Sequence, residues 1–165
     1  MISIEASANR RAVVKQPDCG KSYWQPKPAN GHAEATLTPY ETGFKGLSMG
    51  FQTIAPRGHI REHFHDSQIE LQICHKGKGY VLVDDVRHEL VPGTSCFLGY
   101  NVKHEICNDG DNDLVMMWVI APAGLEEFFA AIGRERAPNS LAPKPFDRPK
   151  DVVAVERQMG MQGTK

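Results

Sequence analysis

Residues 58–77 read GHIREHFHDSQIELQICHKG, a strand-like segment that contains the pattern His-x-His-x4-Glu. The two histidines of this pattern are His63 and His65, and the glutamate is Glu70. A further histidine, His104, follows Glu70 after a gap of 33 residues. Because alternate side chains of a strand lie on one face, we expect His63 and His65 to point the same way. Glu70 and His104 must then arrive from neighbouring strands.

Three imidazoles and one carboxylate are a ligand set that suits divalent ions of the first transition row. We therefore predict one divalent transition metal per chain, bound by His63, His65, Glu70 and His104. Fe(II) is favoured, and Mn, Ni and Zn remain alternatives because several divalent ions accept the same ligands. Four protein ligands around an octahedral ion leave two adjacent positions open to substrate and to a second small molecule.

The length and composition are those of one soluble globular domain. The chain has 165 residues, of which 41% are hydrophobic and 24% charged. A net charge of -1 gives no field that would gather nucleic acid or an anionic membrane. The first six residues do not resemble a signal peptide, and no apolar run reaches the roughly 20 residues of a membrane span. The four cysteines form no Cys-x-x-Cys pair, so we expect mostly buried free thiols and a cytoplasmic location.

Between residues 36 and 121 the chain alternates short β-rich runs with turn residues. The Asp84-Asp85 pair has the character of a two-residue hairpin turn. Short strands at this spacing indicate a β-sandwich or a β-barrel. The expected strands cover residues 47–55, 68–75, 80–83, 87–91, 94–98, 103–107 and 114–120.

Two less regular segments are expected to flank a barrel at 36–121, within a single domain overall. Residues 1–35 form an N-terminal arm, without clear periodicity up to about residue 30. Residues 122–165 form a short helix and a proline-rich tail that wraps the barrel. The helix is predicted over 123–132, and a last short helix over 151–159. One face of the first helix is apolar and consists of Leu125, Phe128, Phe129 and Ile132.

The metal-binding residues resemble the two motifs of the cupin superfamily, over about residues 45–121. The glycine, His-x-His pair, glutamate and glycine of the first motif are matched in order, although Gly58 stands one residue closer to the first histidine than is usual. In the second motif Gly99 and Asn101 replace the common Pro and Gly of a turn. The residues that match the family spacing are His63, His65, Glu70, Gly77, Gly93, His104 and Asn108.

This resemblance implies an all-β fold, the double-stranded β-helix or jelly-roll barrel, with the metal inside it. It implies that His63, His65, Glu70 and His104 are the metal ligands. It also implies a homodimer, in many members with N-terminal strands packed across the interface.

Four more residues are candidates for contact with substrate or with a ligand. Arg61 shares strand parity with His63, so it either binds a carboxylate substrate or forms a salt bridge at the barrel mouth, for instance to a C-terminal acid. Gln72 shares the face of Glu70 and either hydrogen-bonds a metal ligand or packs in the barrel. Met116 and Trp118 share one face of the 114–120 strand, and the sequence does not say which face lines the cavity.

These observations support three functional hypotheses. The first is an Fe(II)-type dioxygenase acting on a small enolisable or hydroxylated aromatic substrate, in which Glu70 also serves as a base. The second is a non-oxidative isomerase, lyase or decarboxylase that uses the metal as a Lewis acid. The third is a non-catalytic cupin that binds a small molecule. No helix-turn-helix flanks the barrel, so we expect a small-molecule substrate and a homodimer, with no nucleic acid or membrane partner.

Overall fold

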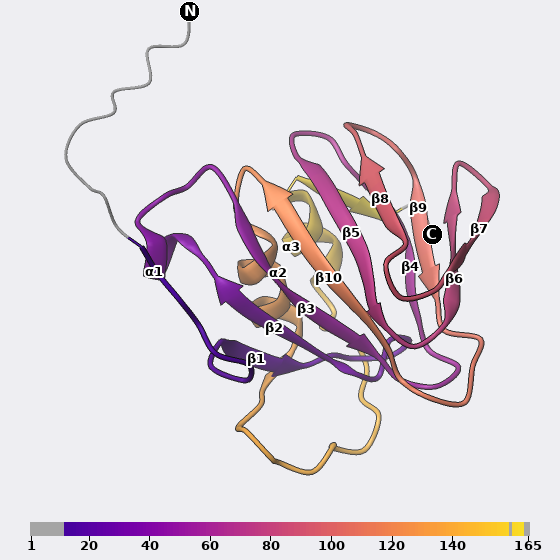
Figure 1. Ribbon diagram of the computed structural model, residues 1–165, viewed down its shortest axis with the longest axis horizontal. Helices are drawn as coiled ribbons and strands as arrows, with labels where there is room; N and C mark the ends of the chain where they lie inside the picture. The colour runs from indigo at the N-terminus through magenta and orange to yellow at the C-terminus, as the bar shows by residue number, and fades with distance from the viewer. Residues whose placement is uncertain (1–11, 159, 164–165) are drawn as a thin grey trace, which may run out of the picture.

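The computed structural model describes residues 12–158 and 160–163 and consists mostly of antiparallel strands in two sheets (Figure 1). The larger sheet has seven strands, in the order β11 (Arg134–Glu135), β1 (Lys21–Trp24), β2 (His32–Leu37), β3 (Ser48–Ile54), β10 (Leu114–Ala121), β5 (Ile69–Lys76) and β8 (Ser95–Leu98). The smaller has five, in the order β12 (Met161–Gly163), β4 (His59–His65), β9 (His104–Cys107), β6 (Gly79–Val83) and β7 (Val86–Leu90). This is the double-stranded β-helix predicted from the sequence.

The predicted strands between residues 47 and 121 are all present, and each of their ends lies within one residue of the prediction. The turn between β6 and β7 is also as predicted. Asp84 and Asp85 have φ values of 46° and 66°, the left-handed conformation that a tight two-residue hairpin requires at both positions.

Strand β10 shows how the core is organised. Its side chains alternate between buried and half-buried positions, as period-two burial against a core requires. Met116 packs in a cluster between the sheets, whereas Trp118 packs in a second cluster beneath helix α2 (Leu125–Ile132). The face of β10 that points inward is therefore the one that carries these two residues. Among the thiols, which are all free, Cys74 and Cys107 are buried as expected.

The N-terminal arm is more regular than expected. Residues 1–11 lie outside the described part of the chain, but β1 pairs with both β2 and β11 and extends the larger sheet. Strand β2 also crosses the expected boundary at residues 35 and 36, so arm and barrel are continuous. The prolines that flank β1 limit its length and do not prevent its pairing. A short helix, α1 (Pro39–Thr42), follows, with Thr38 and Glu41 forming a capping box.

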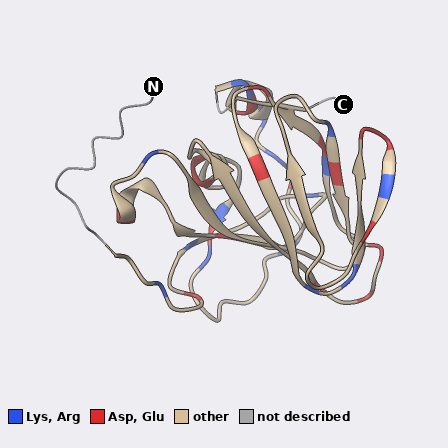
Figure 2. Ribbon diagram, turned by 45° about the horizontal axis from the view of Figure 1, so that its top comes forward, with Lys and Arg blue, Asp and Glu red and all other residues tan. Residues whose placement is uncertain are grey.

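The C-terminal segment lies across the barrel as a wrapping tail. Helix α2 begins two residues later than predicted and buries the predicted apolar face. Helix α3 (Val152–Gln158) leads to β12, an unpredicted strand that pairs with β4. Basic and acidic residues are interspersed along the chain, in keeping with its net charge of -1 (Figure 2). Among the described residues, none of the helices is long and apolar enough to cross a membrane.

The Asn108 side chain ties the loops at one end of the barrel and gives a test of the fold. It is 2% exposed, and its amide nitrogen lies 2.9 Å from the Ile54 carbonyl, 3.1 Å from that of Ala55 and 2.9 Å from that of Asn112. Its Oδ1 accepts a hydrogen bond from the Gly110 amide. We expect Asn108→Ala to lower the free energy of unfolding by about 2–3 kcal/mol, because it leaves buried carbonyls without a donor. Urea denaturation measures this.

The matched control is Asn112→Ala, because the Asn112 side chain is exposed. It should leave the urea midpoint within experimental error of the wild type. An Asn108→Ala protein as stable as this control would show that the Asn108 hydrogen bonds do not stabilise the loops.

Candidate metal centre

Four buried side chains converge inside the barrel. One potential ligand atom from each of His63, His65, Glu70 and His104 lies within 4.8 Å of the others. Their side chains are almost fully enclosed, and the most exposed residue, His63, is 9% accessible. These are the four residues that the sequence singles out.

The two sheets share the centre. Strand β4 carries His63 and His65, and the antiparallel register of β4 and β9 places His104 directly opposite His63. Glu70 comes from β5 in the larger sheet, so the expectation that it lies on a strand neighbouring β4 is wrong. Its Oε2 lies 3.4 Å from Nε2 of His65 and 3.3 Å from Nε2 of His104. The carboxylate therefore reaches the histidines across the interior.

The backbone fixes the tautomers of two of the imidazoles. Nδ1 of His63 lies 2.8 Å from the carbonyl of Arg61, and Nδ1 of His104 lies 3.0 Å from that of Val102. A carbonyl only accepts, so each Nδ1 carries the proton and donates it. The lone pair of each ring is then on Nε2, as a metal ligand requires.

The donor atoms fit a divalent cation. Nε2 of His65, Nε2 of His104 and Oε2 of Glu70 are buried and have no hydrogen-bond partner in the described part of the chain. Buried polar atoms without partners are rare and costly in folded proteins. A cation between them would satisfy all three at once, with neutral imidazole and carboxylate ligands of the kind that zinc, iron and manganese accept.

The electrostatics favour the metal-binding protonation states of His63 and Glu70, but not that of His104. Burial alone would lower the pKa of His104, but the nearby Glu70 carboxylate outweighs this and raises it. Burial lowers the pKa of His63 well below its ordinary value, and the nearby His104 and His65 lower it further. Burial alone would raise the pKa of Glu70, but the nearby imidazoles of His104 and His65 reverse this and bring the pKa below its ordinary value. A neutral His63 and an ionised Glu70 follow, which is the form each takes as a ligand.

Gln72 positions the carboxylate of Glu70. Its Nε2 donates a hydrogen bond of 2.8 Å to Oε1 of Glu70, which leaves Oε2 facing the histidines. The sequence left open whether Gln72 hydrogen-bonds a metal ligand or only packs in the barrel. In the structure it hydrogen-bonds the candidate ligand Glu70.

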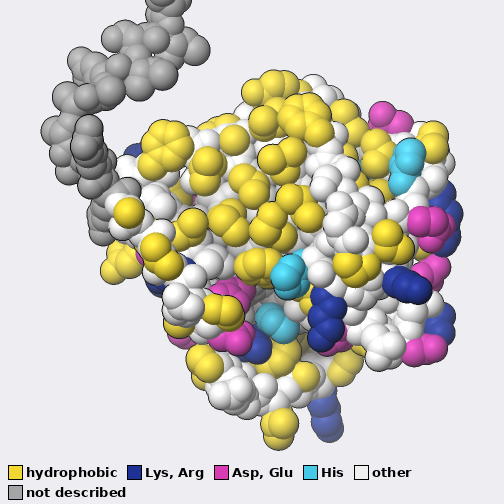
Figure 3. Space-filling model, in the orientation of Figure 1, with side chains coloured by type: hydrophobic (Ala, Val, Ile, Leu, Met, Phe, Trp, Pro, Cys, Tyr) yellow, Lys and Arg dark blue, Asp and Glu magenta, His cyan; other side chains and the backbone are white. Residues whose placement is uncertain are grey.

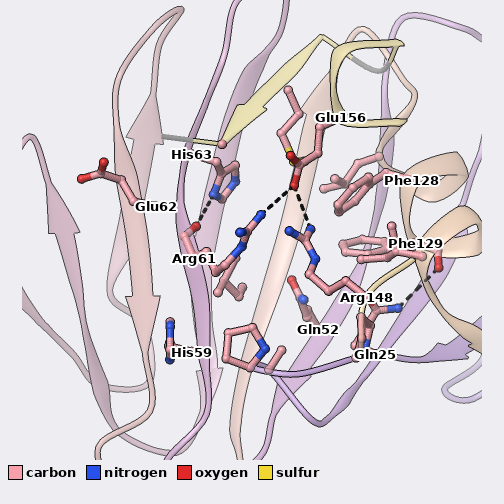
Figure 4. Close-up of a pocket in the computed structure, with 18 of the residues that line it drawn as sticks. Gln25, Gln52, His59, Arg61, Glu62, His63, Phe128, Phe129, Arg148 and Glu156 are labelled. Atoms are coloured by element: carbon pink, nitrogen blue, oxygen red, sulfur yellow. Dashed lines mark hydrogen bonds and ion pairs between the residues drawn. The ribbon is translucent and has the colours of Figure 1, made fainter. Parts of the chain in front are cut away.

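One side of the centre opens into a cavity that encloses about 640 Å³, counting its mouth to solvent. His63, Glu70 and Gln72 contribute to its lining, and the apolar face of α2 forms another wall with Phe128 and Phe129 (Figure 4). A ligand in this cavity would meet the candidate metal centre and an aromatic surface together.

Arg61 lines the same cavity and takes part in an ion pair. Its Nη2 lies 3.1 Å from Oε1 of Glu156 on α3. This is the salt bridge to a C-terminal acid, the second of the two alternatives that the sequence left open. His59, at the start of β4, also lines the cavity and lies outside the group of four ligands.

Met116 and Trp118 point inward without lining the cavity. Both are fully buried in the hydrophobic clusters. Trp118 packs against Phe129, with ring centroids 5.5 Å apart and ring planes tilted by 57°, so it supports the cavity wall from its outer side. These two residues were predicted to contact substrate, but neither reaches the surface of the cavity.

The sequence analysis missed the part of the cavity that the arms supply. Gln25 comes from the N-terminal arm, and Arg148, Glu156 and Met161 come from the tail. The only signals were the apolar face of α2 and the wrapping character of the tail. Neither says which residues of the tail meet the barrel.

The chain is similar to known proteins in sequence and in fold. The family model described as "Cupin domain" matches residues 50–120. The protein SchB of Streptomyces halstedii is 30% identical over 92 residues, which cover 56% of this chain and 67% of SchB.

Two solved structures share the fold. The polyketide cyclase RemF from Streptomyces resistomycificus matches with a TM-score of 0.58 and 17% identity, over 68% of this chain and 79% of RemF. A predicted oxalate decarboxylase from Thermotoga maritima matches with a TM-score of 0.57 and 20% identity, over 68% of this chain and 100% of that one. At these identities the likeness concerns the fold alone.

We expect His104→Ala to weaken divalent metal binding by more than about a hundredfold, because loss of a direct ligand exceeds the loss of an outer hydrogen bond. The barrel should still fold, since the change removes little core volume. Titration of the metal-free protein with Fe(II), Mn(II), Ni(II) and Zn(II) under anaerobic conditions measures the affinity, and circular dichroism reports the fold.

His88→Ala is the control, because His88 is exposed on β7. It should bind metal like the wild type. A His104→Ala protein with full metal content would show that the metal is held elsewhere.

Proposed function

Since this chain belongs to the cupin family, we propose that it is a metal-dependent enzyme acting on a small compound with an enolisable carbonyl group or a hydroxylated aromatic ring. One observation carries the proposal. The buried group of three histidines and Glu70 opens on a cavity with an aromatic wall, so a carbonyl oxygen at the centre would keep its carbon skeleton on apolar surface. Such sites combine a few polar groups with a mostly apolar lining.

A divalent ion held by His63, His65, Glu70 and His104 would supply a Lewis acid that stabilises negative charge on a substrate oxygen. We predict that the bound ion is Fe(II). We also predict that the protein is located in the cytoplasm.

The chain itself supplies the base and the dry surroundings. We assign proton removal from the carbon beside the carbonyl to Glu70, which would detach from the ion to act as the base while Gln72 holds its other oxygen. The rings of Phe128 and Phe129 exclude water from the neighbouring wall. Exclusion of water strengthens every charge interaction in the cavity, including the one that draws the proton to Glu70.

The first candidate reaction is non-oxidative carbon–carbon bond chemistry of the enolate, as in ring closure of a poly-ketone. Two solved structures of this fold bear the names polyketide cyclase and predicted oxalate decarboxylase, and both reactions proceed without net oxidation of the substrate by dioxygen. A polyketide chain is a series of enolisable ketones. Removing a proton next to one carbonyl gives the nucleophile that attacks another, and the cavity meets the candidate metal centre where that carbonyl would bind.

The second candidate is the dioxygenase that the sequence analysis preferred. The ligand set favours it, because three histidines and one carboxylate leave two adjacent positions on an octahedral ion. Dioxygen consumption separates the two candidates, and binding without turnover would indicate a non-catalytic cupin.

The neutral probe 2′-hydroxyacetophenone tests the proposed function, since it carries both an enolisable methyl ketone and a phenol. We expect the metal-loaded protein to exchange the methyl protons with deuterium in D₂O without dioxygen, at least about tenfold faster than buffer with free metal. Proton NMR under nitrogen measures the exchange, and an oxygen electrode in air measures uptake.

The His104→Ala variant is the control and should exchange at the background rate. Stoichiometric oxygen uptake with loss of the probe would favour the dioxygenase instead. Neither exchange nor oxygen uptake, over a panel of aryl ketones, would contradict the proposed enzyme.

We also propose that a second copy of the chain is its partner. The register of four neighbouring strands places an apolar row on the outer face of the larger sheet, formed by Met49, Val119, Leu71 and Phe97. Phe97 is 67% exposed and Leu71 is 39% exposed. Figure 3 shows apolar side chains gathered across this face, in front of β3, β10 and β5. Contiguous apolar surface of this kind marks an interaction site, and a flat sheet face suits an identical partner related by a two-fold axis.

The double substitution Leu71→Glu/Phe97→Glu should convert a dimer into a monomer, because it would bring four carboxylates into an apolar interface. Light scattering coupled to size exclusion measures the mass. Val86→Glu is the control, since Val86 is exposed on β7 in the other sheet. A monomeric wild type, or a double variant that stays dimeric, would contradict this interface.

A further inference from the structure

A second polar cluster lies in the cavity, apart from the candidate metal centre. Oε1 of Glu156 lies 2.9 Å from Nη2 of Arg148 and 3.1 Å from Nη2 of Arg61. One carboxylate oxygen thus pairs with two guanidinium groups, that of Arg61 on β4 and that of Arg148 in the segment before α3 (Figure 4). The Glu156 side chain is 6% exposed and that of Arg148 is 18% exposed.

Arg148 has donor capacity that the described residues do not use. Its Nη1 is buried and has no hydrogen-bond partner there. A buried guanidinium nitrogen without an acceptor is unfavourable, since it has lost its water and gained nothing in exchange. Burial and the charge of Arg61 also lower the pKa of Arg148, although Glu156 opposes this. The Arg148 side chain is therefore a cation with one donor nitrogen that lacks an acceptor, and it lines the cavity.

The tail brings this cluster next to the strand that carries the metal ligands. Strand β12 pairs with β4, and its register places Gly163 opposite His63. A Cβ atom at Gly163 would lie 3.3 Å from Oε2 of Glu156, tighter than an ordinary contact, so the glycine leaves room for the carboxylate. Arg148 and His63 line the same cavity.

We propose that Arg148 is the binding group for a carboxylate on the substrate, with Arg61 adding positive charge beside it. The inference rests on the proposed function and narrows its substrate to ketones or hydroxylated aromatics that also bear an acid group. The substrate carboxylate would accept a hydrogen bond from the Arg148 guanidinium where Glu156 now accepts one, and such charge-assisted hydrogen bonds are stronger than neutral ones. The apolar body of the molecule would lie on Phe128 and Phe129.

Glu156 would compete with a substrate carboxylate for Arg148 and Arg61, because it pairs with both. It occupies Nη2 of both arginines and keeps the two like charges together in the absence of substrate. A substrate carboxylate would share or displace it. The Glu156→Gln variant should therefore bind an anionic ligand more tightly than the wild type, whereas a purely structural ion pair would give no gain.

Binding of two probes of equal shape tests the assignment. Naphthalene-2-carboxylate and the neutral naphthalene-2-carboxamide are titrated into the metal-loaded full chain by isothermal calorimetry. We expect the wild type to bind the carboxylate at least about tenfold more tightly, the size of one charge-assisted hydrogen bond. Arg148→Gln should abolish this preference and leave the affinity for the amide within about twofold. Arg157→Gln, at an exposed position on α3 beside Glu156, should keep the preference.

Three outcomes would overturn the inference. A wild type that binds both probes equally recognises only the apolar body, and this result needs no variant to fold. A preference that survives in Arg148→Gln means that the carboxylate is held elsewhere, such as at the metal. A carboxylate affinity of Glu156→Gln no higher than that of the wild type, with the protein folded by circular dichroism, would exclude competition by Glu156.

Exchange of 2′-hydroxyacetophenone separates this inference from the proposed function, because that probe carries no carboxylate. If the protein catalyses exchange but shows no preference for the carboxylate probe, the proposed enzyme activity stands and the role of Arg148 is wrong. If the protein prefers the carboxylate probe but catalyses no exchange, the role of Arg148 stands and the proposed reaction is wrong.

Discussion

An ionised carboxylate buried between two sheets is the constraint on which the rest of this structure depends. Glu70 is 2% exposed and would be strongly disfavoured there without compensation. Three imidazoles from the opposite sheet surround it, two of them held in a fixed tautomer by carbonyls of their own strands. Gln72 occupies the remaining oxygen. The register of β4 against β9 and the separation of the sheets must both be correct for these partners to meet.

The sequence predicts those parts of the molecule that follow from short-range periodicity. Alternating burial in β10 and the left-handed turn at Asp84 and Asp85 follow from local backbone rules. The four ligands could be identified because their spacing fits the family motifs. By contrast, Arg61 and Glu156 are 95 positions apart, and no periodic pattern links them. The sheet to which Glu70 belongs was also out of reach, since strand order depends on how the whole chain crosses over.

The cavity combines two kinds of surface, and this division shapes the chemistry. Polar groups gather at the candidate metal centre and around Glu156, while α2 offers phenylalanine rings between the arms and the barrel. Trp118 lies behind Phe129 and keeps that wall in place. A molecule that is polar at two points and apolar between them matches this lining better than a sugar or a simple inorganic anion does.

The cavity is also divided along the chain. The family match covers residues 50–120, which include all four candidate ligands. Much of the remaining wall, including Phe128, Arg148 and Glu156, lies after residue 120. The candidate metal centre and much of the cavity wall beside it are thus encoded in separate stretches of the gene. Exchange or drift of the C-terminal stretch would change the shape and charge of the cavity while the four candidate ligands in the barrel are inherited unchanged.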